Sequence, residues 1–330
     1  MRLALAAGRL VVSGWCRLWF RETPALPLEI VRIGLGLALL AGYGFTSGHL
    51  AALYADAGWV SRESVTSLAD NRWGWSLLFL VPAGRPLLLF HAVFLAACAA
   101  FTLGWRTSWA KWAVLAGHLS YAHRSPVVQY GVDSVLAGFL FVLCLAPLGR
   151  AASLDRRRLA RLPGSARGAA ALDQDGSRWR GACVRLLQVQ LAAIMFFAGV
   201  EKVHGDSWWQ GYAVWVALTN HEFANVPVGW LARNFWIVNL LTYFTMFFEV
   251  AYAFLVWGRQ SRPFALLGAV VLHGGMAGMM GLYLFSFVML VAQLVFVPVA
   301  WLHGAMRAWR ALRARSRDAL AGGRRAQAGR

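Results

Sequence analysis

The sequence predicts an all-α fold, a polytopic membrane helix bundle of about eight transmembrane helices with interfacial half-helices. Of the 330 residues, 59% are apolar and only 14% are charged, and the mean hydropathy is +0.54. Soluble domains are about 45–50% apolar and about a quarter charged. The composition therefore excludes a soluble enzyme, a disordered protein and a fibrous repeat. Many of the 17 Trp and 20 Phe residues lie near the ends of apolar runs, where a bilayer interface favours aromatic rings.

The apolar runs define the predicted spans, because a helix needs about 20 apolar residues to cross the hydrocarbon. The third run is short and carries His118 and Tyr121. The segments 73–82 and 208–220 are too short to cross and predict half-helices in the interface. The eight predicted spans cover residues of about 29–52, 86–104, 109–123, 132–149, 181–203, 236–257, 263–281 and 284–303.

Three regions follow from this pattern. Residues 1–27 interleave Arg with Leu and Trp, which predicts an amphipathic helix on the inner surface. Arg9 interrupts the apolar run that a signal peptide requires. Residues 28–304 form the predicted transmembrane domain, and residues 305–330 form a basic cytoplasmic tail.

The net charge of +18 is explained by the placement of basic residues on one side of a membrane and not by a nucleic-acid partner. Thirty of the 32 basic residues are Arg. With the N-terminus inside, 26 of the 32 fall on inner segments and six on outer ones, as the positive-inside rule requires. We therefore expect a multi-pass cell-membrane protein with both termini cytoplasmic. Its basic loop 150–180 would lie near anionic lipid. The Arg- and Ala-rich composition favours a bacterial inner membrane.

The cysteines predict no metal or dithiol site. Cys16, Cys98, Cys144 and Cys183 lie far apart, and no Cys-x-x-Cys or Cys/His cluster occurs. We therefore expect no metal ligands, and we interpret these residues as small hydrophobic side chains.

Lys202 is the first candidate for chemistry, because it is one of only two lysines. Unlike arginine, a buried lysine can lose its proton and act as a neutral base. Lys202 closes the fifth predicted span at its outer end and shares a helical stripe with Gly199, which would let a backbone or a ligand approach. The alternative is a lysine that snorkels to the interface from a helix end.

Three further ionisable residues fall within or beside predicted spans. Glu249 lies on a polar stripe of the sixth span, in its inner half, and is expected to pair with Arg185 or Arg32. His273 is followed by Gly274 and other small or Met residues, which indicates a cavity, although a hydrogen-bonded packing histidine is an alternative.

Asp133 stands at the outer entry to the fourth span, where it is expected to cap the helix N-terminus. Ser153 and Asp155 are expected to cap backbone amides on the inner side. His91 and His118 have no supporting pattern and are interpreted as packing residues.

Three segments resemble a known family. MFFAGVEKVHGDSWWQGYAVW (195–215) resembles the Ala-Gly-Val-x-Lys signature of vitamin K-dependent γ-carboxylases and the wider HTTM membrane family. HGGMAGMMGLYLFSFVML (273–290) is similar to a carboxylase helix in which a His precedes a small/Met stretch. The stretch from Asp133 to Ser153-Leu154-Asp155 is similar to the family's turn-helix-S-x-D block.

The resemblance implies a carboxylase-like (lyase) chemistry. It implies that Lys202 is the base that deprotonates vitamin K hydroquinone, a quinone cofactor, and that His273 lies near the site. Asp133 stands where the family has a functional His. The chain ends soon after the last predicted span, so the carboxylases' large β-rich domain for substrate binding is not expected.

Two functions remain open at this stage. The first is a quinone- or lipid-linked enzyme that modifies a peptide or small substrate at the outer face. The alternative is a non-catalytic membrane partner for the maturation or export of another protein or peptide. A transporter is less favoured, because no inverted repeat is visible. For the enzyme, Lys202, His273 and Asp133 are expected to converge on one cavity lined by cofactor-binding Gly199, Trp208 and Met276, with Gly274 allowing close helix approach.

Overall fold

The computed structural model of the protein describes residues 12–67, 74–161, 177–223, 225–305, 307–309 and 311. In these ranges the chain is helical, and the one β-type contact is an isolated bridge between Thr23 and Ser177. This confirms the all-α prediction. The chain divides into two units, residues 1–295 and 296–330.

The N-terminal region is helical over residues 12–19. Trp15, Arg17 and Leu18 are all exposed there, and its amphipathic placement on the inner surface stays a prediction. Residues 1–11 of the expected helix lie outside the described residues.

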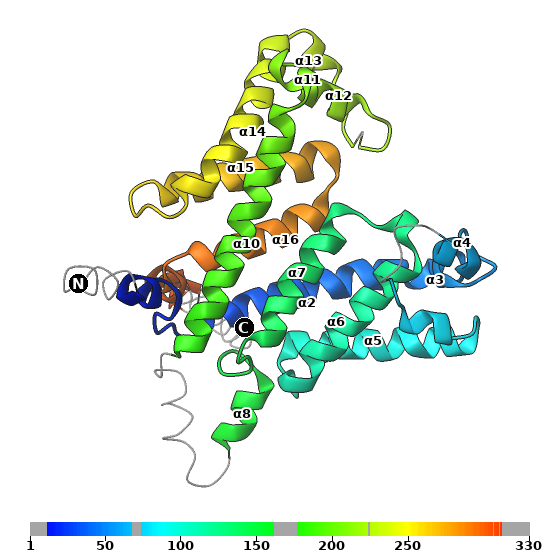
Figure 1. Ribbon diagram of the computed structural model, residues 1–330. Helices are drawn as coiled ribbons and strands as arrows, with labels where there is room; N and C mark the ends of the chain where they lie inside the picture. The colour runs from blue at the N-terminus through cyan, green and yellow to red at the C-terminus, as the bar shows by residue number, and fades with distance from the viewer. Residues whose placement is uncertain are drawn as a thin grey trace, which may run out of the picture. The chain divides into compact units, whose positions relative to one another are not determined.

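The first half of the chain forms one group of packed helices (Figure 1). Helix α2 packs against α5, α5 against α6, and α6 against α7. Pro27 and Pro86 lie in the first turns of α2 and α5, where a missing amide hydrogen does no harm. The elements are α2 (Leu26–Thr46), α3 (Leu50–Tyr54), α4 (Arg62–Ser67), α5 (Arg85–Leu103), α6 (Thr107–Arg124) and α7 (Gly131–Leu145).

The second half adds helices that close back onto the first. Helix α10 packs against α14, α14 against α15 and α15 against α16, and α16 returns to contact α2 and α7. Gly281 joins α15 to α16 at φ +71°, a left-handed conformation that favours glycine. The elements are α8 (Leu154–Ala160), α10 (Arg178–Val203), α11 (Asp206–Trp209), α12 (Ala213–Thr219), α13 (Gly229–Ala232), α14 (Phe235–Leu255), α15 (Arg262–Met280) and α16 (Tyr283–Gln293).

The count of eight spans is not confirmed. Helices occur at all eight predicted positions, but in the described residues only five are long and apolar enough to cross, or six if a C-terminal helix pair counts as one broken span. Helix α7 has 15 residues and α16 has 11, about 22 Å and 17 Å long, which is short of a hydrocarbon core of about 30 Å. Helix α6 has 18 residues but is too polar. The five spans are Leu26–Tyr54, Arg85–Leu103, Arg178–Val203, Phe235–Leu255 and Arg262–Met280.

The short predicted half-helices are confirmed for the second segment and only in part for the first. Residues 208–220 contain the end of α11 and all of α12. The described part of 73–82 forms a single 3₁₀ turn, Leu77–Leu80, which packs against α6.

A buried ion pair fastens the start of α2 to the chain after α7. Glu29 Oε2 lies 2.6 Å from Arg32 Nε, and both side chains are almost fully buried. Glu29 Oε1 accepts a hydrogen bond from the backbone of Arg150 at 2.8 Å, and Arg32 donates to the carbonyl of Ala152 at 3.0 Å. Arg32 therefore pairs with Glu29, one turn away on the same helix, and not with Glu249.

The Ser153-Leu154-Asp155 block caps two helices. The Ser153 hydroxyl accepts from the backbone of Arg156 in the first turn of α8. The carboxylate of Asp155 accepts hydrogen bonds from the backbone amides of Arg106 and Thr107, both at 2.8 Å, and from the Thr107 hydroxyl at 2.7 Å. The capping prediction is confirmed, but Asp155 caps the start of α6 across the fold.

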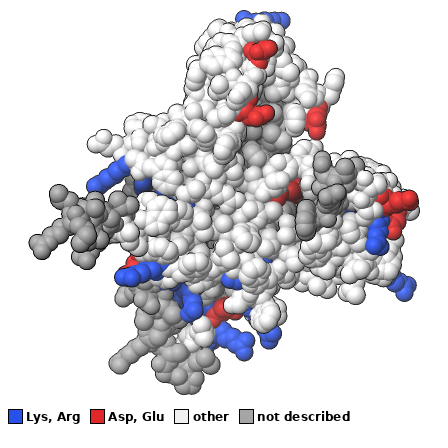
Figure 2. Space-filling view, in the orientation of Figure 1, with Lys and Arg blue, Asp and Glu red and all other residues white. Residues whose placement is uncertain are grey.

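Charged side chains are sparse on the visible face (Figure 2). Most of that face is uncharged, and the Lys, Arg, Asp and Glu side chains lie mainly toward the ends of the helices. This distribution suits helices whose middle portions contact lipid.

Candidate functional site: a lysine–glutamate pair and a separate cavity

Lys202 forms a short ion pair with Glu249 of α14. The Lys202 Nζ and Glu249 Oε2 atoms lie 2.6 Å apart. The Glu249 side chain is 6% exposed and that of Lys202 is 23% exposed. Lys202 therefore does not snorkel alone from a helix end, because its charge is matched by a nearly buried carboxylate.

Two further contacts orient the Lys202 ammonium. Its Nζ donates to the carbonyl of Ala198 at 3.2 Å and lies 5.4 Å from the centre of the Trp208 ring. An ammonium has three N–H donors. Among the described residues Ala198 is the one hydrogen-bond acceptor of Nζ, and Glu249 is its ion-pair partner. The ammonium, whose side chain is partly exposed, thus keeps N–H donors for a ligand.

Gly199 brings the two helices close enough for this pair to form. A Cβ atom at Gly199 would lie 2.7 Å from the backbone nitrogen of Val250 and 3.0 Å from Cβ of Glu249. Only glycine permits such an approach. The sequence prediction of close approach at Gly199 is confirmed, with the backbone of α14 as the partner.

The polar stripe of α14 holds the chain that follows Lys202. Asn239 donates to the carbonyl of Gly211 at 2.9 Å, and the backbone amide of Val214 donates to the Thr242 hydroxyl at 3.3 Å. Tyr243 donates to the carbonyl of Trp209 at 2.8 Å. The stripe that the sequence indicated therefore fixes α11, α12 and the lysine as one unit.

The pair corrects the expected partner and depth of Glu249. Arg185 donates instead to the carbonyl of Leu18 at 3.2 Å and lies 5.0 Å from the ring of Trp257. Because Lys202 and Glu249 touch, they lie at nearly the same depth. The outer-end position of Lys202 and the inner-half position of Glu249 therefore cannot both hold.

His273 is buried on α15, and neither ring nitrogen has a hydrogen-bond partner among the described residues. Its ring faces that of Phe285 at 5.9 Å. The packing of His273 against Phe285 fits the alternative of a packing histidine, but the hydrogen bond expected with it does not occur among the described residues. Gly274 does not allow close helix approach as expected, because a Cβ there would meet nothing within 4 Å. Met276 is half-buried on the same helix.

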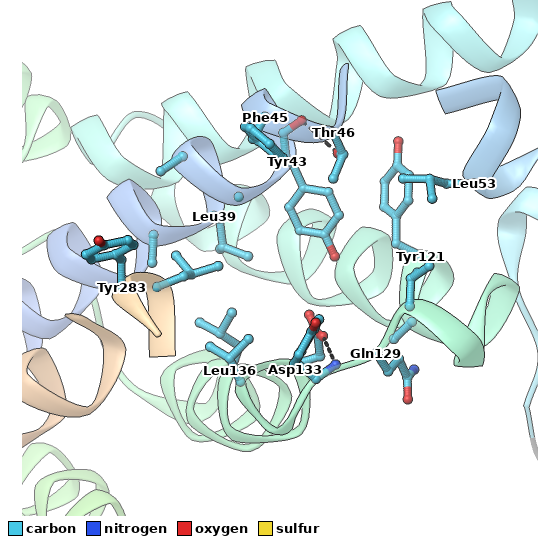
Figure 3. A pocket seen from close by; sticks show the side chains of 18 of the residues that line it. Leu39, Tyr43, Phe45, Thr46, Leu53, Tyr121, Gln129, Asp133, Leu136 and Tyr283 are labelled. Carbon is cyan, nitrogen blue, oxygen red and sulfur yellow. Dashed lines mark hydrogen bonds between the residues drawn. The ribbon is translucent and has the colours of Figure 1, made fainter. Parts of the chain in front are cut away.

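Asp133 lies in a different place, beside a cavity of about 1020 Å³. Its Oδ2 accepts from the backbone amide of Tyr130 at 2.9 Å, so Asp133 caps α7 from the helix's third residue. The carboxylate also points toward the hydroxyl of Tyr43 (Figure 3). Helices α2, α3, α6, α7 and α16 all contribute to the cavity wall.

Two tyrosines that line this cavity are each paired with a histidine, and the sequence interpretation missed both pairs. Tyr43 and His118 Nδ1 are 2.9 Å apart, and His118 Nε2 lies 2.9 Å from the carbonyl of Asp133. Tyr121 lies 2.8 Å from His91 Nδ1. The span of His118 also carries Tyr121, whereas the span of His91 has no tyrosine, and no sequence spacing joins residues 43 and 118.

The predicted site residues thus fall into separate places. Lys202, Gly199 and Trp208 lie together, with Glu249 as an addition. Asp133 lines the cavity, whose described wall includes neither Lys202 nor His273. The convergence of all three residues on one site stays a prediction.

This fold and this pair define a class: a multi-pass helical membrane protein with a buried lysine–carboxylate pair between two packed helices. The HTTM domain model matches residues 20–301, and the chain belongs to the HTTM family, whose domain is found in vitamin K-dependent gamma-carboxylase. No match was found among curated proteins or among solved structures.

Proposed function

We propose that this protein is a membrane enzyme that uses Lys202 as a base and Glu249 as its proton partner. The observation that carries the proposal is the 2.6 Å contact between Lys202 Nζ and Glu249 Oε2, in a position where the partly exposed ammonium keeps N–H donors for a ligand. Membership of the HTTM family supports it, because the resembled carboxylase motif places the base at this lysine.

The pair allows proton transfer in two steps. Lys202 is an ammonium when paired and cannot accept a proton in that form. Transfer of one proton from Nζ to Oε2 of Glu249 produces a neutral amine and a neutral carboxylic acid without a change in total charge. The amine can then accept a proton from an acidic hydroxyl, and Glu249 holds the first proton until it returns to solvent.

A quinol fits the accessible side of this site in part. Trp208 presents an aromatic face next to Nζ, and the free N–H of Lys202 can reach an oxygen atom. Gly199 does not fit a cofactor-binding role, because α14 covers it. A quinol bound there would supply the acidic hydroxyl and reducing electrons. The substrate class would be a peptide or small molecule at the outer face, and modification of it would be carboxylase-like, hence a lyase activity.

The orientation in the membrane belongs to the same proposal. The charge asymmetry puts loop 150–180 in the cytoplasm and Lys202 near the outer side. Reporter fusions at Gly176, which lies outside the described residues, and at Gly205 should report opposite sides. The same side for both would reject this orientation.

Oxygen-dependent consumption of a naphthoquinol by protein in mild detergent tests the base. Lys202→Ala and Lys202→Arg are each expected to lower the rate at least about 100-fold, because arginine does not give up its proton. Lys111→Arg alters the other lysine and should keep the rate. Full activity of Lys202→Arg would reject the base.

The cellular phenotype separates the enzyme from a non-catalytic partner. Lys202→Ala protein that is expressed normally should lose its cellular function if Lys202 is a base. Retained function with normal expression would favour the partner for maturation or export.

A further inference from the structure

The cavity beside Asp133 has a polar end and an apolar end. Asp133, Tyr43 and Tyr121 gather at the polar end (Figure 3). The apolar wall is formed mainly by α2 and α16, and Phe45 and Phe287 are exposed along it. Because α2 is a candidate membrane span, this wall is open to hydrocarbon chains.

Hydrogen bonding fixes what the polar end offers a ligand. The carbonyl of Asp133 can only accept, so a neutral His118 must donate from Nε2, and its Nδ1 then accepts from the Tyr43 hydroxyl. The Tyr43 oxygen is left with acceptor capacity. One oxygen of the Asp133 carboxylate is engaged by the backbone amide of Tyr130, which leaves the other as a further acceptor.

The second pair repeats this arrangement. Ser47 donates its hydroxyl hydrogen to the carbonyl of Tyr43 at 3.2 Å, so it accepts from His91 Nε2 at 2.9 Å. His91 Nδ1 then accepts from Tyr121. The Tyr43 oxygen and the Asp133 carboxylate are therefore the acceptors at the polar end, and the head group that matches them is a hydrogen-bond donor.

The charge of the cavity wall limits the chemical class of the ligand's head group further. Asp133 is the one charged side chain among the described residues that line the cavity, and no Lys, Arg or His lines it with them. A phosphate would meet a carboxylate with no cation to offset the repulsion. An uncharged hydroxyl can donate to the carboxylate at no such penalty.

We propose that this cavity binds a neutral amphiphile, a long hydrocarbon chain that ends in a hydroxyl group, with the hydroxyl donating to Asp133. The volume of about 1020 Å³ suits a lipid-sized ligand. The site is separate from Lys202 and Glu249, so the inference does not rest on the base proposed above.

Photolabelling of the detergent-purified full chain with a diazirine-bearing hexadecanol tests the proposal. Labels should map to peptides of α2, α7 and α16. Excess unlabelled hexadecanol should compete, whereas hexadecyl phosphate should compete at least tenfold more weakly because Asp133 repels it. Hexadecylamine should also compete at least tenfold more weakly, because its ammonium must lose its hydration shell to enter an apolar cavity. Equal or stronger competition by the phosphate or by the amine would overturn the neutral-head assignment.

Variants separate this site from lipid that merely coats the surface. Asp133→Asn removes the charge of the acceptor and should weaken hexadecanol competition about tenfold. Ala41→Trp fills the cavity from an exposed position of α2 that lines it, and it should abolish the label. Ala92→Trp, at an exposed position of α5 outside the cavity, should leave labelling unchanged. Labelling that persists in both Asp133→Asn and Ala41→Trp would refute the proposal. Naphthoquinol consumption, measured on the same variants, shows separately whether the proposed role of Lys202 as a base holds.

Discussion

Breaking the Lys202–Glu249 pair from either side should have unequal effects on stability. Lys202→Met leaves a carboxylate that is 6% exposed without its cation, whereas Glu249→Gln leaves an ammonium that is 23% exposed and can turn to solvent. Loss of one partner from a buried pair destabilises by about 3–5 kcal/mol, and exposed pairs contribute about 0–1 kcal/mol. We therefore expect Lys202→Met to lower the free energy of unfolding by about 3 kcal/mol and Glu249→Gln by about 1 kcal/mol.

The double variant Lys202→Met/Glu249→Gln should recover most of the loss caused by Lys202→Met. The neutral amide removes the unpaired buried charge, so the double variant should lose only about 1 kcal/mol, a coupling energy of about 3 kcal/mol. Reversible unfolding in mixed detergent micelles, followed by the fluorescence of the 17 Trp residues, measures all four proteins. Glu201→Gln, at the exposed neighbour of Lys202, is the matched control and should change stability by less than about 0.5 kcal/mol. Equal losses for both single variants with additive double-variant behaviour would refute the pairing.

Three further predictions are tested by the same unfolding assay, and the third also by amide hydrogen exchange. Gly199→Ala must push α14 away and should lower the free energy of unfolding by about 2–3 kcal/mol. Gly274→Ala has open space around its Cβ and should be neutral or stabilising by about 0.5 kcal/mol. Similar effects of both variants would contradict the helix contact at Gly199. Glu29→Gln should cost about 3–5 kcal/mol because it leaves the fully buried Arg32 uncompensated, and a loss under about 1 kcal/mol would show that the pair is not buried. Asp155→Ala removes three hydrogen bonds from the first turn of α6 and should cost about 1–2 kcal/mol, with faster amide exchange confined to that turn; unchanged exchange there would reject the cap.

Some site features were predictable because they depend on local spacing. The stripe that contains Asn239, Thr242 and Glu249 follows helical periodicity, and all three side chains make contacts with the chain around α10 to α12. Close approach at Gly199 followed from the same reasoning, because a missing side chain beside a charged residue leaves room for a neighbour.

The identity of ionic partners was not predictable in this way. Glu249 pairs with Lys202, and Arg32 pairs with Glu29, although both Glu249 pairings expected from the sequence involved arginine. Glu29 lies one turn from Arg32 on the same helix, whereas Lys202 reaches Glu249 only because two helices cross, and a crossing is a property of two packed surfaces. The histidine–tyrosine pairs are invisible in the sequence for the same reason, since 75 residues separate Tyr43 from His118.

The sequence by itself determined that the chain lies in a membrane and that it is helical, because composition and periodicity report directly on lipid exposure and on the faces of single helices. It also carries the family-like motif around Lys202. Only the tertiary structure decided how many helices are long enough to cross, which acid meets Lys202, and that Asp133 faces a cavity apart from that lysine. Helix ends depend on caps and turns supplied from elsewhere in the chain, as Asp155 at the start of α6 shows. Side-chain partners depend on the packing of helices far apart in sequence, and no local pattern encodes that packing.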